Sequence, residues 1–175
     1  FAQNTAGRYI NDLGAGSGTV TIENQGPISS TIKISSSAPL LHSTRITLFE
    51  KLDRIELDNT IEQNFSEVTT WNFDFNLNSP VTHHEEVGAI INANLTTNGG
   101  HYSPINARYD WLTLNHFVDL SEGARGITLS NADCYFMQLG NSTNDYLDSS
   151  SPFISILAGG QVDGKGLGIF AQDGD

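Results

Sequence analysis

The stretch Trp71-Asn72-Phe73-Asp74-Phe75-Asn76-Leu77-Asn78 decides the fold, because large apolar residues alternate with polar ones along its whole length. In an extended chain, successive side chains point to opposite faces, so this stretch presents one apolar face and one polar face. A helix would scatter the same residues around its whole surface. The stretch therefore predicts a β-strand that is buried on one side.

The same period of two recurs along most of the chain. No segment keeps helical periodicity over three turns, and turn residues separate the alternating segments. Many short strands joined by turns are typical of a sandwich or a barrel. Besides the quoted stretch, strands are expected around residues 19–23, 31–35, 45–48, 55–62, 89–95, 112–118, 126–129, 135–139 and 153–157. We expect an all-β protein, an antiparallel β-sandwich, with residues 1–175 forming a single domain.

Two segments lack this alternation. Residues 1–17 are rich in Gly, Ala and Asn and are expected to form a loop or a frayed edge, and residues 141–152 are expected to form a polar loop. Aspartates in such loops, for example Asp145, Asp148 and Asp163, do not match the spacing of a calcium-binding loop. The sequence leaves bound calcium open.

Charge and composition narrow the partners. The chain has 8 basic and 20 acidic residues, a net charge of −12, and the basic residues do not cluster. A nucleic acid or an anionic membrane would need such a cluster, so neither is an expected partner. No apolar run reaches the roughly 18 residues of a spanning helix, so we expect a soluble protein with no membrane partner. Neutral sugars and cationic ligands remain as possible partners.

The two ends favour a piece of a longer polypeptide. The chain starts at Phe1 without an initiator Met or a signal segment, and it ends at Asp175 in a stretch that resembles the middle of a protein. A secreted protein whose leader was removed is the alternative. The compartment stays unknown.

Histidine and glutamate gather at His83-His84-Glu85-Glu86. Adjacent residues of an extended chain point to opposite faces, so the two histidines cannot converge on one metal ion as His residues spaced i and i+2 can. The run is therefore predicted to be a polar loop between strands. His116 has the phase of the apolar residues Leu112, Leu114 and Val118 and is predicted to be half-buried and hydrogen-bonded.

Aromatic residues offer flat faces to sugar rings. Tyr109 and Trp111 precede a predicted strand beside Arg108, which favours an exposed platform. We predict a carbohydrate-binding surface made of Arg108, Tyr109, Trp111 and His116. Trp71, in contrast, is in phase with the core and is expected to be buried.

Residues 115–135, Asn-His-Phe-Val-Asp-Leu-Ser-Glu-Gly-Ala-Arg-Gly-Ile-Thr-Leu-Ser-Asn-Ala-Asp-Cys-Tyr, resemble a known family. The stretch is similar to the C-terminal β-sandwich region of the glycoside hydrolase family 38 α-mannosidases, where Val-Asp-Leu-Ser leads through a turn to Gly-Xaa-Xaa-Leu-Xaa-Asn-Xaa-Xaa-Tyr. Residues 23–27, 45–49 and 53–57 also resemble segments of that region, in the same order. The chain departs from the family pattern at Phe117, at Phe136 and at residues 158–160.

This resemblance implies a galactose mutarotase-like supersandwich excised from a larger glycosidase. Its function would be that of an accessory C-terminal domain, which packs on an N-terminal catalytic domain and helps to shape carbohydrate binding. The zinc ion and the two catalytic aspartates of the family belong to that catalytic domain. No catalytic residue and no cofactor can be carried over to this chain, so whether it is an enzyme by itself stays open.

Two alternatives remain at this point. The chain is either a free-standing carbohydrate-binding module or a sugar epimerase that uses a His as acid and a Glu as base. For the epimerase, the candidate residues are His101, His116 and Glu122.

Overall fold

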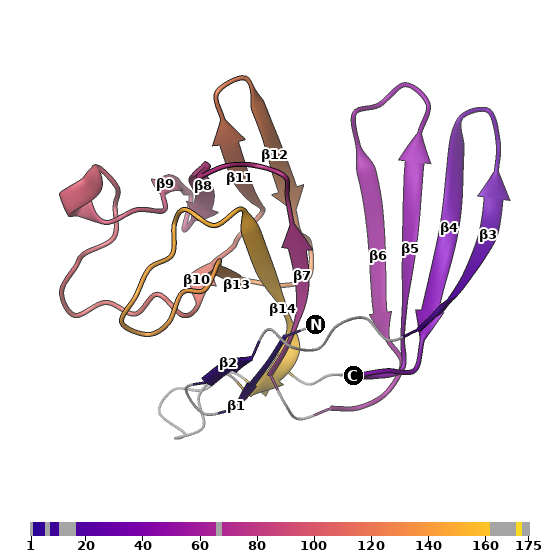
Figure 1. The fold of residues 1–175 in the computed structure, drawn as a ribbon, viewed down its shortest axis with the longest axis horizontal. Coiled ribbons are helices and arrows are strands. Elements are labelled where there is room, and N and C mark those ends of the chain that lie inside the picture. The colour runs from indigo at the N-terminus through magenta and orange to yellow at the C-terminus, as the bar shows by residue number, and fades with distance from the viewer. Residues whose placement is uncertain (1, 6–7, 11–16, 66–67, 162–170, 173–175) are drawn as a thin grey trace.

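A computed structural model describes residues 2–5, 8–10, 17–65, 68–161 and 171–172 of the chain. The described residues form three antiparallel sheets and one short 3-10 helix, η1 (Thr96–Asn98) (Figure 1). The all-β prediction is therefore confirmed. The described part of the chain contains no helix long and apolar enough to cross a bilayer.

The first two sheets form a sandwich. The long sheet has the strand order β10-β13-β14-β7-β1-β2, with β15 paired to β14, and the short sheet has the order β12-β11-β8-β9. The strands of the long sheet are β1 (Ala2–Thr5), β2 (Arg8–Ile10), β7 (Val68–Asp74), β10 (Leu112–Thr113), β13 (Phe136–Leu139), β14 (Phe153–Gln161) and β15 (Ala171–Gln172). The strands of the short sheet are β8 (Val81–Glu86), β9 (Ala89–Asn92), β11 (Phe117–Glu122) and β12 (Arg125–Ser130).

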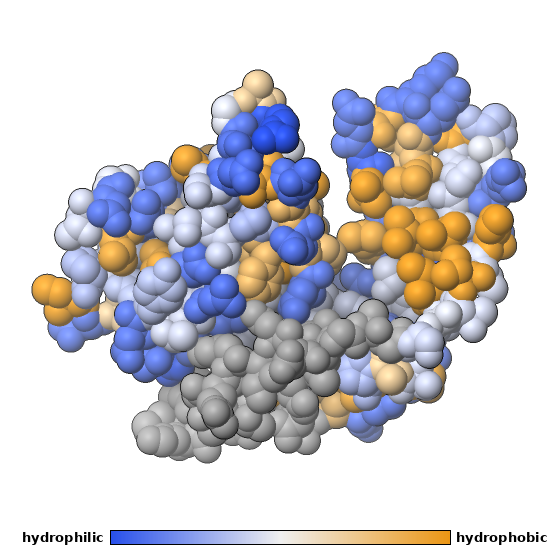
Figure 2. Space-filling view, in the orientation of Figure 1, coloured by the Kyte–Doolittle hydropathy of each residue, from blue (hydrophilic) through white to orange (hydrophobic). Residues whose placement is uncertain are grey.

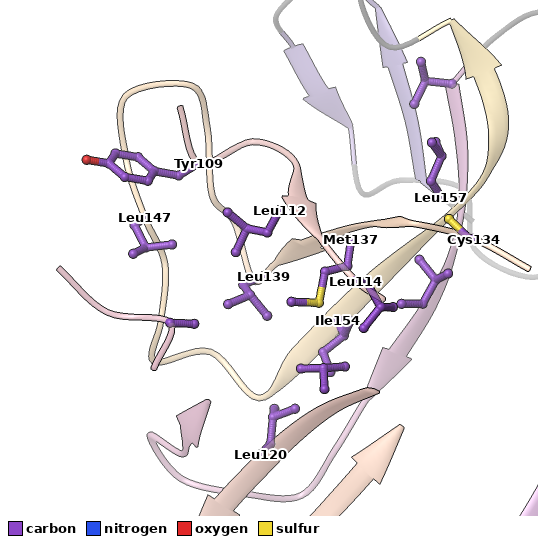
Figure 3. Packing of buried hydrophobic residues seen from close by; sticks show 14 residues of the cluster. Tyr109, Leu112, Leu114, Leu120, Cys134, Met137, Leu139, Leu147, Ile154 and Leu157 are labelled. Atoms are coloured by element: carbon purple, nitrogen blue, oxygen red, sulfur yellow. The ribbon is translucent and has the colours of Figure 1, made fainter. Parts of the chain in front are cut away.

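One apolar cluster lies between these two sheets. Val118 and Leu120 of β11 meet Met137 of β13 and Ile154 of β14 in this cluster, and all four are fully buried. Figure 3 shows Leu120, Ile154, Met137 and Leu114 close together, with Tyr109 and Leu147 at one end of the cluster. The alternation in β11 and β13 places these residues on the inner faces, as in other sandwiches.

Strand β7 contains the first half of the quoted alternating stretch, residues 71–74, and lies in the middle of the long sheet, between β14 and β1. The strand ends at Asp74, earlier than the alternation does, and the N–H of Phe75 donates to the carbonyl of Pro152 at 3.0 Å. Phe73, Phe75 and Leu77 are partly buried against the apolar cluster. The prediction of a strand with one buried face is thus confirmed for residues 71–74, and the apolar row continues into the loop.

The third sheet, here called the outer sheet, stands beside the sandwich (Figure 1). It has the order β3 (Thr19–Gln25), β4 (Ser29–Ser36), β5 (His42–Phe49) and β6 (Ile55–Ile61), joined by short turns. The His42 ring of β5 makes an edge contact with Trp71 of β7, with 5.8 Å between the ring centroids. This contact joins the start of β5 to the sandwich, and Trp71 is half-buried there.

The segments without alternation differ from each other. Strands β1 and β2 form within residues 1–17, which were expected to be a loop or a frayed edge, and they pair at the end of the long sheet. Residues 141–152 contain no strand, as expected. Asp148 is nevertheless buried there, and it accepts hydrogen bonds from the N–H groups of Asn141, Ser150 and Ser151. This loop is ordered around one carboxylate.

Candidate functional site

Residues 83–86 lie in strand β8, so the prediction of a polar loop there is wrong. Strand β8 pairs with β11 on one side and β9 on the other, in the interior of the short sheet. His84 lies opposite Val118 and faces the core with 0% of its surface exposed, whereas His83 lies on the other face of the sheet. The prediction that adjacent histidines point to opposite faces is confirmed.

A chain of hydrogen bonds connects the Nε2 side of the buried His84 ring to Tyr102 and Glu86, whereas the buried Nδ1 has no hydrogen-bond partner among the described residues. Its Nε2 lies 2.9 Å from the hydroxyl oxygen of Tyr102, and the Tyr102 hydroxyl donates to Oε2 of Glu86 at 3.1 Å. An ionised carboxylate only accepts, so the tyrosine must donate its proton to Glu86 and accept one from His84. The neutral His84 therefore carries its proton on Nε2.

Burial perturbs two groups of this network. The pKa of His84 is lowered mainly by burial, against the opposing effect of the Glu86 charge. Burial, together with the Glu86 carboxylate, raises the pKa of Tyr102. Both groups are consequently neutral near pH 7, and the network of His84, Tyr102 and Glu86 joins the short sheet to the loop that carries Tyr102.

The predicted carbohydrate-binding residues Arg108, Tyr109 and Trp111 lie in the segment before β10. Tyr109 is only 5% exposed, its hydroxyl donates to the carbonyl of Ser103 at 2.6 Å, and its ring packs edge-on against Tyr102. The expectation of an exposed platform at Tyr109 is therefore wrong, because the Tyr109 ring is buried in the apolar cluster. Trp111 is half-buried. Arg108 is exposed, and its guanidinium forms an ion pair with the buried carboxylate of Asp110, with 2.5 Å between Nη2 and Oδ2.

His116, the fourth predicted binding residue, lies on the surface. Its side chain is 77% exposed, and its Nδ1 lies 2.7 Å from Oε2 of Glu85, so the prediction of a half-buried His116 is wrong while that of a hydrogen bond is confirmed. The strand expected through this position is interrupted, because β10 ends at Thr113 and β11 begins at Phe117. The alternation that places Leu114 in the core therefore does not extend to His116.

The three residues considered for sugar epimerisation are not gathered. Glu122 accepts from the N–H of Asn78 and pairs with Arg125 at the β11–β12 turn, whereas His101 accepts from the N–H of Asn92. His116 pairs with Glu85 instead of Glu122. A His and a Glu thus do meet, as a hydrogen-bonded contact between the exposed His116 and the partly buried Glu85.

In the part of the chain that the structure describes, no group of three His, Cys, Asp or Glu side chains lies close enough together to bind a metal ion. The family resemblance places its zinc ion in the catalytic domain and not in this chain. Of the loop aspartates, Asp148 is held by its own loop, and Asp163 lies outside the described residues.

The outer sheet presents a second candidate site, an apolar face without charge. Residues opposite each other in an antiparallel sheet share a face, and Ile22, Ile32, Ile46 and Leu57 form one row across β3, β4, β5 and β6. Val20, Ile34, Leu48 and Ile55 lie on the same face next to this row. We call these eight residues the apolar face.

Among the described residues, few cover this face. Ile22 is 69% exposed, and Val20, Leu48, Ile55 and Leu57 are exposed as well. Figure 2 shows the hydrophobic colour gathered over the middle of the outer sheet. Monomeric soluble proteins rarely expose apolar patches larger than a few hundred Å², and larger patches mark interaction sites. The sequence alternation predicted the two-faced strands, but it could not show that this face lacks a cover.

The opposite face of the outer sheet is polar and charged. Arg45 of β5 donates to Glu23 at 2.8 Å and lies 3.5 Å from Asp58 of β6. The Thr31 and Thr47 hydroxyls are hydrogen-bonded across β4 and β5 at 2.9 Å. The outer sheet therefore has its solvent face on one side and a face of core-like composition on the other.

Comparison with protein-family models, with curated proteins and with solved structures found no match for this chain.

The two candidate sites have different chemistry. The network of His84, Tyr102 and Glu86 is internal and hydrogen-bonds the buried Nε2 of His84, which is a structural task. The apolar face offers only van der Waals contact and burial from water. It can bind another apolar protein surface, and it has no group for acid–base or nucleophilic chemistry.

Proposed function

We propose that this chain is an accessory β-sandwich domain of an α-mannosidase-like glycoside hydrolase, and that it packs on the catalytic domain of that enzyme. The observation that carries the proposal is the exposed apolar face of the outer sheet. A sheet with one apolar face is stable in water when that face is buried against another layer. The catalytic domain would supply the layer, and the apolar face would be the docking surface.

The position of the family-like segments supports this assignment. Residues 115–135 contain the β11–β12 hairpin, and their apolar residues Val118 and Leu120 are fully buried in the sandwich. Residues 23–27 form the end of β3 and the start of the turn to β4. The segments that resemble the mannosidase family are therefore scaffold segments, which fits an accessory domain better than a catalytic one.

The expected contribution to sugar binding lies on the loop side of the sandwich. Arg108 and His116 are exposed, and Trp111 is half-buried, so these three remain available to contact a carbohydrate. Tyr109 would act by holding its loop through Ser103 and Tyr102. We therefore propose that Arg108, Trp111 and His116 make the contacts with the carbohydrate.

Activity and gene structure test the proposal. The purified chain should not hydrolyse an aryl α-mannoside with or without added zinc, and it should not accelerate the mutarotation of a fresh aldose solution. The coding sequence of the same polypeptide should include a barrel with His and Asp zinc ligands. Hydrolysis by the chain alone with bound zinc would contradict the proposal, and so would a gene that encodes no such barrel. Mutarotation that is lost in His116→Ala would favour the epimerase instead.

A further inference from the structure

The apolar face has the composition of a sandwich core but lies at the surface. None of the strand residues on this side of the outer sheet is Asp, Glu, Lys or Arg, and the polar ones are Ser, Thr, Asn and Gln together with the buried His42 at the start of β5. One of these, Thr44, donates its hydroxyl hydrogen to Oδ1 of Asn59 at 2.8 Å within the sheet. A surface that approaches this face meets no charge that it would have to desolvate.

The geometry points to a second copy of this chain as the occupant of the apolar face when the chain is alone in solution. Two copies would pack their outer sheets face to face around a twofold axis. This inference extends the proposed function, because the second copy would occupy the surface that the catalytic domain covers in the whole enzyme. It concerns the isolated chain, which can be tested without that enzyme.

The shape of the face suits another sheet. Sheets pack face to face about 10 Å apart, with side chains of alternate positions from both layers in contact. The row of Ile22, Ile32, Ile46 and Leu57 crosses all four strands, so a twofold axis through its middle would place the same row of the second copy against it. An interface of this kind is isologous, and it closes at two copies.

Charge favours this arrangement over a random contact. Each copy has a net charge of −12, so most of its surface repels a second copy. The charged residues of the outer sheet, among them Glu23, Arg45 and Asp58, lie on the opposite face and stay in water. Pairing through the uncharged face therefore keeps like charges far apart, and added salt should strengthen it by screening the remaining repulsion.

The area of the apolar face indicates which class of interface the dimer would have. Four strands about 4.8 Å apart, with about seven residues each at about 3.3 Å per residue, cover roughly 450 Å² of flat sheet. Stable complexes bury about 800 Å² per partner, and smaller interfaces are weak or transient. Exposed Ile28 and Leu52 in the adjoining turns add apolar surface. The dimer should therefore belong to the weak or transient class of interfaces.

A pair of neighbouring substitutions tests the inference. Ile22 and Thr21 are adjacent, both are exposed, and they point to opposite faces of β3. Ile22→Glu would bury an unpaired charge in the dimer, whereas Thr21→Glu would place the same charge opposite Lys33 on the polar face. Both variants should keep the far-UV circular dichroism and the unfolding midpoint of the parent chain, because neither residue is buried in the monomer.

Sedimentation equilibrium over a range of chain concentrations gives the readout. We expect a monomer–dimer equilibrium that Ile22→Glu weakens at least about tenfold and that Thr21→Glu leaves unchanged. A parent chain that stays monomeric into the high micromolar range would overturn the inference. Equal effects of the two variants, or open-ended growth beyond the dimer, would do so as well.

The same instrument separates this inference from the proposed function. If the catalytic domain of the enzyme converts the dimer into a one-to-one complex, both hold. If the dimer forms but the catalytic domain does not disperse it, the inference holds and the docking proposal fails. If the chain is monomeric and still binds the catalytic domain, only the inference fails.

Discussion

Removal of one oxygen atom from Tyr102 should destabilise the sandwich by an amount that the hydrogen bonds predict. Tyr102→Phe deletes the acceptor of His84 Nε2 at 2.9 Å and the donor to Glu86 at 3.1 Å, and His84 is fully buried. A buried donor that is left without a partner costs about 1–3 kcal/mol. We therefore expect the free energy of unfolding to fall by about 2 kcal/mol, or roughly 5 °C in the midpoint of a chain of this size.

Urea unfolding at pH 8, followed by the fluorescence of Trp71 and Trp111, measures this change. Tyr135→Phe is the matched control, because Tyr135 is 62% exposed and the same oxygen is lost there to water. The control should lie within about 0.5 kcal/mol of the parent chain. A Tyr102→Phe variant as stable as Tyr135→Phe would refute the argument that the network stabilises the sandwich.

A second variant separates the network from simple packing. His84→Leu removes the buried polar ring and leaves Tyr102 bonded to Glu86. Replacement of both partners by apolar groups can be nearly neutral, so Tyr102→Phe should cost less in the His84→Leu background than alone. Additive costs in the two variants would show that the hydrogen bond between His84 and Tyr102 contributes nothing.

Three further predictions concern the sandwich. Leu120→Ala should lower the free energy of unfolding by about 2–5 kcal/mol, because Leu120 is fully buried, and the exposed Ile90→Ala in the same sheet should cost less than about 1 kcal/mol. Burial lowers the pKa of His84 in the folded chain, so as the pH falls the unfolded chain takes up a proton on this ring before the folded chain does. The contribution of His84 to the free energy of unfolding should therefore be constant above about pH 7 and should decrease as the pH falls below about 6.5. This decrease should be absent in His84→Leu. Asp148→Asn should destabilise the chain by about 1–3 kcal/mol in urea unfolding, because its carboxylate accepts from the N–H groups of Asn141 and Ser151, and equal stability would contradict a role for that carboxylate in the loop. Gly140 adds to this loop, since its φ of 48° and the carboxylate of Asp148 next to it leave no room for a β-carbon.

Alternation predicted the strands well where apolar residues carry it. The segment around Ile32 and Ile34 and the segment around Ile46 and Leu48 both form strands, because every second residue is a large aliphatic. The strand at Val81–Glu86 was missed for the converse reason. Its inward position is His84, which is stabilised in the core by Tyr102, a residue 18 positions further along the chain. A local pattern of apolar and polar residues cannot contain that information.

The prediction of a half-buried His116 was wrong for a different physical reason. Its phase follows Leu112 and Leu114, but the chain leaves the long sheet after Thr113 and enters the short sheet at Phe117. The N–H of Leu114 donates to the carbonyl of Tyr135, and the N–H of Asn115 donates to that of Glu85. These long-range bonds turn the chain between the two sheets, and they are set by tertiary packing and not by the local sequence.

The apolar face could be predicted only in part. The alternation in residues 19–62 correctly indicates strands with one apolar side, but a period of two does not say which layer covers that side. In the sandwich, the cover is the second sheet of the same chain, as for Leu120 and Ile154. For Ile22 and Leu57, the described residues supply little cover, and this absence is what points to a partner.

Calorimetric titration of the catalytic domain into the chain measures whether the outer sheet docks on that domain. We expect a one-to-one complex with a negative heat-capacity change, which is the signature of apolar burial, and loss of binding in Ile22→Glu but not in Thr21→Glu. No heat of binding, or equal binding by the two variants, would contradict this expectation.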